Sequence, residues 1–147
     1  MAQKCAEYYA AKGNIDSTCP KKDSAGENQY GTWYMSKPPS CGSMANSATT
    51  FWYNAAEDYD YRQPGFSQKT GSFTQLVWKG SKTVGVGCAA KNGFAVFVAL
   101  YSPAGNMLAL GPDPNYFFKQ NVLPPSRPAR RDNEVQKSSY VKVYRAK

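Results

Sequence analysis

Ser72 is the residue of this chain that most directly raises the question of catalysis. It lies in the stretch GSFTQLVWK (71–79), and a serine hydroxyl can act as a nucleophile when a general base lies within hydrogen-bond reach. The 147-residue chain contains no histidine, so that base would have to be Glu27, Asp16 or a lysine of lowered pKa. Nothing in the sequence places such a base beside Ser72. We therefore expect no enzymatic activity, with a residual hydrolase as an alternative.

The four cysteines are candidates for metal binding or for disulfide formation. They are Cys5, Cys19, Cys41 and Cys88, and none has the CxxC spacing in which structural zinc sites supply their ligands in close pairs. An even number allows two disulfides, in three possible pairings, or one disulfide and two free thiols. The sequence favours disulfides over zinc and does not choose among the pairings.

An aromatic segment is the second candidate site. Residues 59–66 read YDYRQPGF, which places aromatic side chains at the first, third and eighth positions around a Pro64-Gly65 turn. Such a turn could offer a flat apolar wall to a fused-ring ligand such as a sterol. Alternatively, Tyr59, Tyr61 and Phe66 only pack on the domain, and the sequence does not decide between the two.

The positive charge is concentrated near the C-terminus. The chain has a net charge of +8, of which residues 126–147 contribute +5. We expect one domain over residues 1–125, followed by a basic tail that could contact an anionic membrane. No nucleic-acid-binding motif accompanies the charge, so we expect no nucleic-acid partner.

Two helices are expected in the first half of the chain. Residues 2–12 are strong helix formers followed by Gly13, which predicts a short amphipathic helix. Asn46 or Ser47 could cap a second helix, and residues 36–47 are expected to be irregular up to that cap. The second helix would direct these side chains inward: Phe51, Trp52, Ala55, Ala56 and Tyr59. Residues 26–35, GENQYGTWYM, are expected to begin as a helix and continue as an extended segment.

A β-hairpin is the clearest pattern in the second half. Val84, Val86 and Cys88 alternate with small residues, Asn92-Gly93 predicts a tight turn, and residues 94–101 form an apolar run. That run is apolar in both alternating sets, so both of its faces must be covered. The expected fold is therefore α+β, an α-β-α sandwich with a small antiparallel sheet between helical layers. A short strand is also possible at residues 140–144. The aromatic residues expected in the core are Trp33, Trp78, Phe94 and Phe97.

Seven segments, taken together and in order, resemble the CAP superfamily of cysteine-rich secretory, antigen 5 and pathogenesis-related proteins. They read GEN (26–28), WY (52–53), QPGF (63–66), GSFTQLVWK (71–79), VGVG (84–87), YSPAGN (101–106) and NVLPP (121–125). The similarity covers residues 2–125 and is greatest to the Golgi-associated plant pathogenesis-related type. The resemblance implies the same α-β-α sandwich, with an additional N-terminal helix that should precede Ala2 and is missing here.

The resemblance also implies a central cavity, which in relatives holds two histidines and two acids proposed to bind a divalent metal. Glu27 matches one acid, whereas Ser72 stands at a histidine position, Ala55 at the second acid, and Asp16 or Ser17 near the first histidine. A serine hydroxyl does not replace an imidazole ligand, so we expect neither a metal site nor a cofactor. Ser72 is expected to be a polar cavity-wall residue that hydrogen-bonds the backbone. Glu27 is expected in the first turn of a helix.

The expected function depends on the aromatic segment at residues 59–66. In fungal and animal relatives a loop with this aromatic spacing is implicated in sterol binding, which makes Tyr59, Tyr61, Pro64 and Phe66 the expected ligand-binding residues. We expect a non-enzymatic, secreted protein that binds a sterol or another hydrophobic molecule, although no signal peptide is visible in the chain. The alternatives are an effector or defence protein that acts on a partner protein or an anionic membrane, and an intracellular, membrane-associated location.

Overall fold

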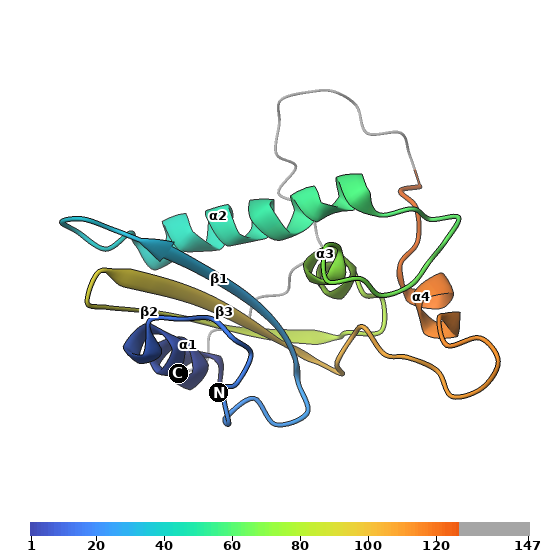
Figure 1. Cartoon of the computed structure of the whole chain (residues 1–147), viewed down its shortest axis with the longest axis horizontal. Helices are drawn as coiled ribbons and strands as arrows, with labels where there is room; N and C mark the ends of the chain where they lie inside the picture. Colours follow the sequence, from blue (N-terminus) through green and yellow to red (C-terminus); the bar gives the residue numbers. More distant parts are fainter. Residues whose placement is uncertain (127–147) are drawn as a thin grey trace.

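Figure 1 shows the computed structural model of the chain. The structure describes residues 1–126. Its elements are α1 (Ala2–Lys12), β1 (Gly26–Trp33), α2 (Cys41–Asn54), the 3₁₀ turn η1 (Ala55–Asp58), α3 (Gly71–Leu76), β2 (Thr83–Lys91), β3 (Phe94–Ser102) and α4 (Tyr116–Asn121). The strand predicted at residues 140–144 and the basic tail beyond Ser126 lie outside the described residues. Among the described helices, none combines the length and the apolar character that a membrane span requires.

The sheet has three antiparallel strands in the order β1-β3-β2. The predicted hairpin is confirmed: β2 and β3 are joined at Asn92-Gly93, where both residues have positive φ angles of 51° and 83°. β3 is the central strand, and every residue from Phe94 to Tyr101 is buried. The prediction of a strand covered on both faces is confirmed as well.

Two helical layers bury the two faces of β3. One face, with Phe94, Val96, Val98 and Leu100, packs against α1. The other, with Ala95, Phe97, Ala99 and Tyr101, packs against α2 and Leu76 of α3. Figure 1 shows α1 on one side of the sheet and α2 with α3 on the other. The predicted α-β-α sandwich is confirmed.

Helix α1 has the predicted limits because its local sequence determines them. Gly13 adopts the left-handed conformation (φ 71°) and its N–H caps the carbonyls of Tyr9 and Ala10. The helix lies very close to the sheet at Gly87, where a Cβ atom would be only 2.4 Å from the backbone of Gln3. The Gln3 side-chain amide exchanges two hydrogen bonds with the Cys88 backbone, at 2.9 and 3.1 Å, and so covers part of the free edge of β2.

The helical beginning predicted for residues 26–35 is wrong. Residues 26–33 form β1, which pairs with β3 along its whole length, from Gly26 with Tyr101 to Trp33 with Phe94. The free edge of β3 satisfies backbone groups over eight residues, and Gly31 is a poor helix former that fits beneath the Phe94 ring. Glu27 therefore lies in a strand and has no helix N-terminus to stabilise.

The predicted start of the second helix is also wrong. α2 begins at Cys41, where Ser40 caps it by accepting a hydrogen bond from the Ser43 N–H at 3.1 Å. Its buried side consists of Met44, Ala48 and Trp52, spaced by four residues. Phe51 lies about 100° around the helix from Trp52 and is exposed rather than interior.

Three of the four aromatic residues predicted for the core are buried, namely Trp78, Phe94 and Phe97. Trp33 is mostly exposed. It occupies the last position of edge strand β1, where its ring contacts Phe94 with the ring centroids 4.7 Å apart.

The four cysteines form two disulfides, Cys5–Cys19 and Cys41–Cys88. The first connects α1 to the segment that leads into β1. The second connects the start of α2 to β2. Each helical layer is therefore covalently tied to a neighbouring segment, and the disulfide interpretation of the cysteines is confirmed.

Candidate functional site

Glu27 is held on the α1 face of the sheet. Its side chain is only 5% exposed, and its carboxylate accepts hydrogen bonds from the Tyr9 hydroxyl (3.1 and 3.0 Å), from Gln29 Nε2 (2.7 Å) and from Lys22 Nζ (3.2 Å). The Lys22 ammonium supplies the compensating charge that a buried carboxylate needs. Gln29 and Lys22 both donate to Oε1, and among residues 1–126 Oε2 accepts only from the Tyr9 hydroxyl, so three side chains of this chain hold the carboxylate in place.

The Tyr9 hydroxyl is the central group of this network. It donates to Glu27 and accepts from the Cys19 N–H at 3.0 Å, a position fixed by the disulfide between Cys19 and α1. Burial raises the pKa of Tyr9, and the negative charge of Glu27 raises it further, against the opposing effect of the Cys19 N–H. Tyr9 therefore stays neutral and acts as a donor.

Asp16 lies in the exposed turn after α1. It forms an ion pair with Lys12 and accepts from the Thr18 hydroxyl at 2.6 Å. The Lys12 ammonium, followed by Thr18, lowers the pKa of the Asp16 carboxyl to about 2. Next to it, the Ser17 hydroxyl accepts from Gln29 Nε2 at 2.7 Å, so Ser17 joins the outer part of the Glu27 network.

Ser72 lies on the opposite side of the sheet. Adjacent strand residues point to opposite faces, and Asn28, next to Glu27, donates through Nδ2 to the Ser72 carbonyl at 3.0 Å and to the Tyr101 hydroxyl at 3.2 Å. Within residues 1–126 only the Ser72 carbonyl, and not its hydroxyl, takes part in these bonds, so the expectation that the hydroxyl bonds the backbone stays a prediction. The Ser72 carbonyl is the group that anchors α3 to β1.

The four positions predicted from the resemblance do not form one cluster. Glu27 and Asp16 lie on the α1 side, Ser72 lies on α3, and Ala55 packs against the aromatic cluster around Tyr59. Among the described residues, no three His, Cys, Asp or Glu side chains come together as metal ligands. The donor set at these positions, one carboxylate already paired with Lys22 and a hydroxyl, does not fit a zinc-like ion.

The aromatic loop packs largely on the domain. The ring of Tyr59 meets those of Tyr61 and Phe73 at centroid distances of 5.0 and 5.7 Å, and both contacts belong to a buried cluster that includes Trp78 and Phe118. These edge-to-face and tilted contacts are favourable for aromatic pairs. Tyr59 and Tyr61 therefore contribute to the core of this end of the molecule.

Two side chains of the loop, Tyr59 and Phe66, have groups that the packing of the domain does not fully use. The Tyr59 hydroxyl is buried, and burial raises its pKa, whereas the nearby Gly65 backbone lowers it in part. Within residues 1–126 no partner of this hydroxyl meets full hydrogen-bond geometry, so Gly65 supplies at most a weak contact. Phe66 is 51% exposed, and its ring lies against Gly71, where a Cβ atom would come within 2.8 Å of it. Pro64, which lies between Tyr59 and Phe66 in the sequence, is half-buried.

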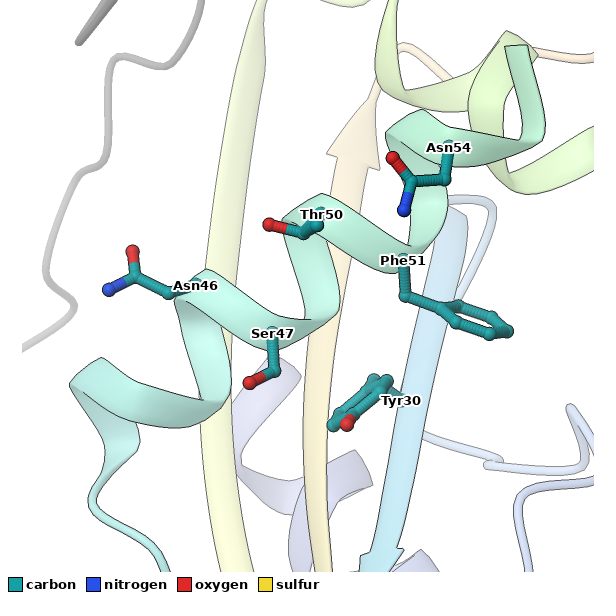
Figure 2. Close-up of a pocket in the computed structure, with 6 residues that line it drawn as sticks. All are labelled: Tyr30, Asn46, Ser47, Thr50, Phe51 and Asn54. Atoms are coloured by element: carbon teal, nitrogen blue, oxygen red, sulfur yellow. The ribbon is translucent and has the colours of Figure 1, made fainter. Parts of the chain in front are cut away.

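The sequence did not reveal a shallow groove between α2 and β1. Figure 2 shows the residues that line its 420 Å³ volume: Tyr30, Asn46, Ser47, Thr50, Phe51 and Asn54. Tyr30 projects from β1 toward α2 and meets Phe51 at a centroid distance of 5.9 Å. The sequence feature that could have indicated the groove is the four-residue spacing of Met44, Ala48 and Trp52. In a helix that begins at Cys41 these residues form the buried side, and Phe51 then faces away from the core.

Comparison with known proteins identifies relatives of this chain. A sequence model of the cysteine-rich secretory protein family (CAP) matches residues 1–101. Protein PRY2 of Saccharomyces cerevisiae is 41% identical over 130 residues, covering 84% of this chain and 32% of that protein. Human Golgi-associated plant pathogenesis-related protein 1 is 47% identical over 77 residues, covering 52% of this chain and 47% of that protein.

A solved structure has the same fold. The crystal structure of NaASP2 with Zn²⁺ superposes with a TM-score of 0.56 at 24% identity, covering 78% of this chain and 62% of that one. The chain spans less than half the length of the two curated relatives named above. The match over residues 1–101 and the identity to PRY2 show that the chain belongs to the CAP family of cysteine-rich secretory proteins.

Proposed function

We propose that this chain is a non-enzymatic CAP protein that binds a sterol or another apolar small molecule at the aromatic loop, residues 59–66. The observation that carries the proposal is the buried Tyr59 hydroxyl, which has no full hydrogen bond within residues 1–126 and lies in an otherwise apolar cluster. CAP family proteins can bind lipids or sterols, which makes this loop the first place to test.

The loop has the chemistry for an apolar ligand that carries one hydroxyl. A buried hydroxyl without a partner costs about 1–3 kcal/mol, and a ligand hydroxyl that reached Tyr59 would recover part of that cost. Phe66 is half exposed and rests on a glycine, so its ring can move aside without displacing a side chain at position 71. The apolar body of the ligand would then lie against Tyr61 and be covered by the Phe66 ring.

The surroundings of Ser72 support a role without catalysis. Its hydroxyl has no hydrogen bond to a base within residues 1–126, and Glu27 points to the other face of the sheet. A serine nucleophile needs a base within about 3 Å. The proposal therefore gives Ser72 a structural role through its backbone.

Secretion is part of the same proposal. CAP homologues are often secreted, and both disulfides are of the kind that persists in an oxidising compartment. The alternative of an effector or defence protein that acts through its surface and basic tail remains a prediction, because the tail lies outside the described residues.

A sterol titration tests the proposal. We expect Tyr61→Ala and Phe66→Ala to weaken the binding of a fluorescent cholesterol analogue about tenfold each, because each removes an aromatic contact worth about 1.4 kcal/mol. Phe51→Ala is the matched control, since Phe51 is similarly exposed but lies on α2 beside Tyr30. Equal binding by the wild type and all three variants would rule out the loop.

Tyr59→Phe separates recognition from folding. Removing an unpartnered hydroxyl should leave the free energy of unfolding unchanged or raise it, while sterol affinity falls. If Tyr59→Phe bound the sterol as tightly as the wild type, the hydroxyl would have no part in ligand recognition.

A further inference from the structure

The loop between β3 and α4 exposes large apolar side chains. Leu110 is fully exposed, and about half of the surface of Met107 and of Leu108 is accessible. Tyr116 and Phe117 of α4 add two partly exposed aromatic rings. Isolated exposed apolar residues are ordinary, but five within eleven positions concentrate exposed apolar surface in one segment, here called the patch, which is typical of an interaction surface.

The patch is held on a rigid base. Asn106 accepts from the Thr74 hydroxyl at 2.6 Å and donates through Nδ2 to the Gly71 carbonyl at 2.8 Å, which fixes the start of the loop to α3. The Ala109 N–H donates to the Pro114 carbonyl at 2.9 Å and closes the loop on itself. The loop backbone is therefore already ordered, and little backbone entropy is lost when the loop is buried.

Cationic residues lie at the same end of the molecule. The Lys79 and Gly80 N–H groups donate to the carbonyl and the side chain of Asn121 at 3.1 and 2.8 Å, which brings the turn containing Lys79 and Lys82 against α4. On the loop itself Asp113 is neutralised by Lys119, with Nζ 2.6 Å from Oδ2. The exposed apolar loop is therefore accompanied by positive charge.

This combination favours a lipid surface as the partner. The groove between α2 and β1 is lined by residues of those two elements and does not include the loop. In Figure 1 the loop and α4 project at the end of the molecule opposite the β2–β3 turn. Projecting leucines with flanking lysines match the acyl boundary and the anionic headgroups of a membrane.

We propose that residues 107–117 form a membrane-docking tip, in which Leu108 and Leu110 insert into the interface of an anionic bilayer while Lys79 and Lys82 contact the headgroups. The tip lies beside the aromatic loop, because Gly65 packs closely against the Asn115 side chain. A Cβ atom added at Gly65 would be 2.9 Å from Asn115 Oδ1. Docking at this tip does not depend on the aromatic loop binding a sterol.

Vesicle sedimentation with the full chain tests the tip. We use sterol-free vesicles of phosphatidylcholine with and without phosphatidylserine, at about 0.1 M and about 1 M salt, since high salt screens the charges of the basic tail and the lysines. Leu108→Ser with Leu110→Ser should lower the partition coefficient about tenfold at both salt concentrations. Lys79→Gln with Lys82→Gln should lower it about fivefold per lysine, on anionic vesicles at low salt only.

Met35→Ser is the matched control for Leu110→Ser. Met35 is fully exposed like Leu110 but follows β1, away from the tip, so this change should leave vesicle binding unaltered. A Leu110→Trp variant should be quenched by brominated lipid above the level of the wild type, whereas Met35→Trp should not.

Two outcomes would overturn the proposal. One is equal vesicle binding by the wild type and the double leucine variant. The other is a dimer of the wild type that the double leucine variant abolishes, without any difference in vesicle binding, because the tip would then be a contact between copies of this chain. Sterol binding from detergent solution is measured separately, so failure of the tip and failure of the aromatic loop remain distinguishable.

Discussion

The Tyr9 hydroxyl bridges the Glu27 carboxylate and the Cys19 backbone, with both carboxylate oxygens within 3.1 Å and the Cys19 nitrogen at 3.0 Å. One side chain thereby ties α1, the disulfide-closed turn and β1 together. The acid of the GEN motif is part of the structural core in this chain, because its carboxylate is buried and hydrogen-bonded to Tyr9, Lys22 and Gln29 on the α1 face.

Tyr9→Phe should lower the free energy of unfolding by about 1–3 kcal/mol, because it leaves the buried carboxylate and the Cys19 N–H each short of a partner. Urea denaturation measures the loss. Tyr8→Phe is the matched control: its hydroxyl only meets that of Thr18 at an exposed position, and the change should cost less than about 0.5 kcal/mol. Equal losses in the two variants would show that the Tyr9 network contributes nothing to stability.

Stability should fall in alkaline solution. Burial raises the pKa of Tyr9 and of Tyr101 above the value near 10 expected in the unfolded chain. Because the folded pKa is the higher one, the stability from keeping these hydroxyls neutral is complete below about pH 10 and is lost as the pH rises toward the folded pKa. The free energy of unfolding, measured by urea denaturation from pH 8 to 11, should therefore decline, and Tyr101→Phe should make the decline shallower. A decline as steep in Tyr101→Phe as in the wild type would contradict this assignment.

Asn28, rather than Ser72, should be the sensitive residue between β1 and α3. Asn28→Ala removes buried hydrogen bonds to the Ser72 carbonyl and the Tyr101 hydroxyl, so it should cost about 2–3 kcal/mol. Ser72→Ala keeps its backbone carbonyl and should change stability by less than about 0.5 kcal/mol. Thermal unfolding of both variants measures the difference. A larger loss in Ser72→Ala than in Asn28→Ala would show that the serine hydroxyl has a role that the geometry does not give it.

The two disulfides should differ in their contribution to stability. The sequence separation is 14 residues for Cys5–Cys19 and 47 for Cys41–Cys88, and loop-closure entropy predicts about 3 and about 4 kcal/mol respectively. Replacing each pair with alanine and measuring urea denaturation without reductant tests the order. If the shorter loop proved the more stabilising, the additional contribution would come from the Tyr9 network that Cys19 positions.

Local sequence patterns were sufficient for several elements. Gly13 ended α1 where predicted, Asn92-Gly93 formed the hairpin turn, and the doubly apolar run at residues 94–101 became the central strand. These features depend on backbone conformation and on side-chain alternation within a few residues, so the sandwich and its family could be predicted from the sequence.

Long-range contacts determined the rest. β1 was predicted to begin as a helix, and this prediction was wrong. The extended form of residues 26–33 is favourable only because these residues pair with the edge of β3, which is about 70 residues away in sequence. Strand alternation then separates Glu27 from Asn28 and Ser72, so the candidate cavity residues lie on opposite faces. The exposed loop at residues 107–117 likewise depends on Asn106 bonding Thr74 and Gly71. The sequence by itself determined which elements could form, and the tertiary structure determined which side chains meet, because strand pairing and loop anchoring join residues that are distant along the chain.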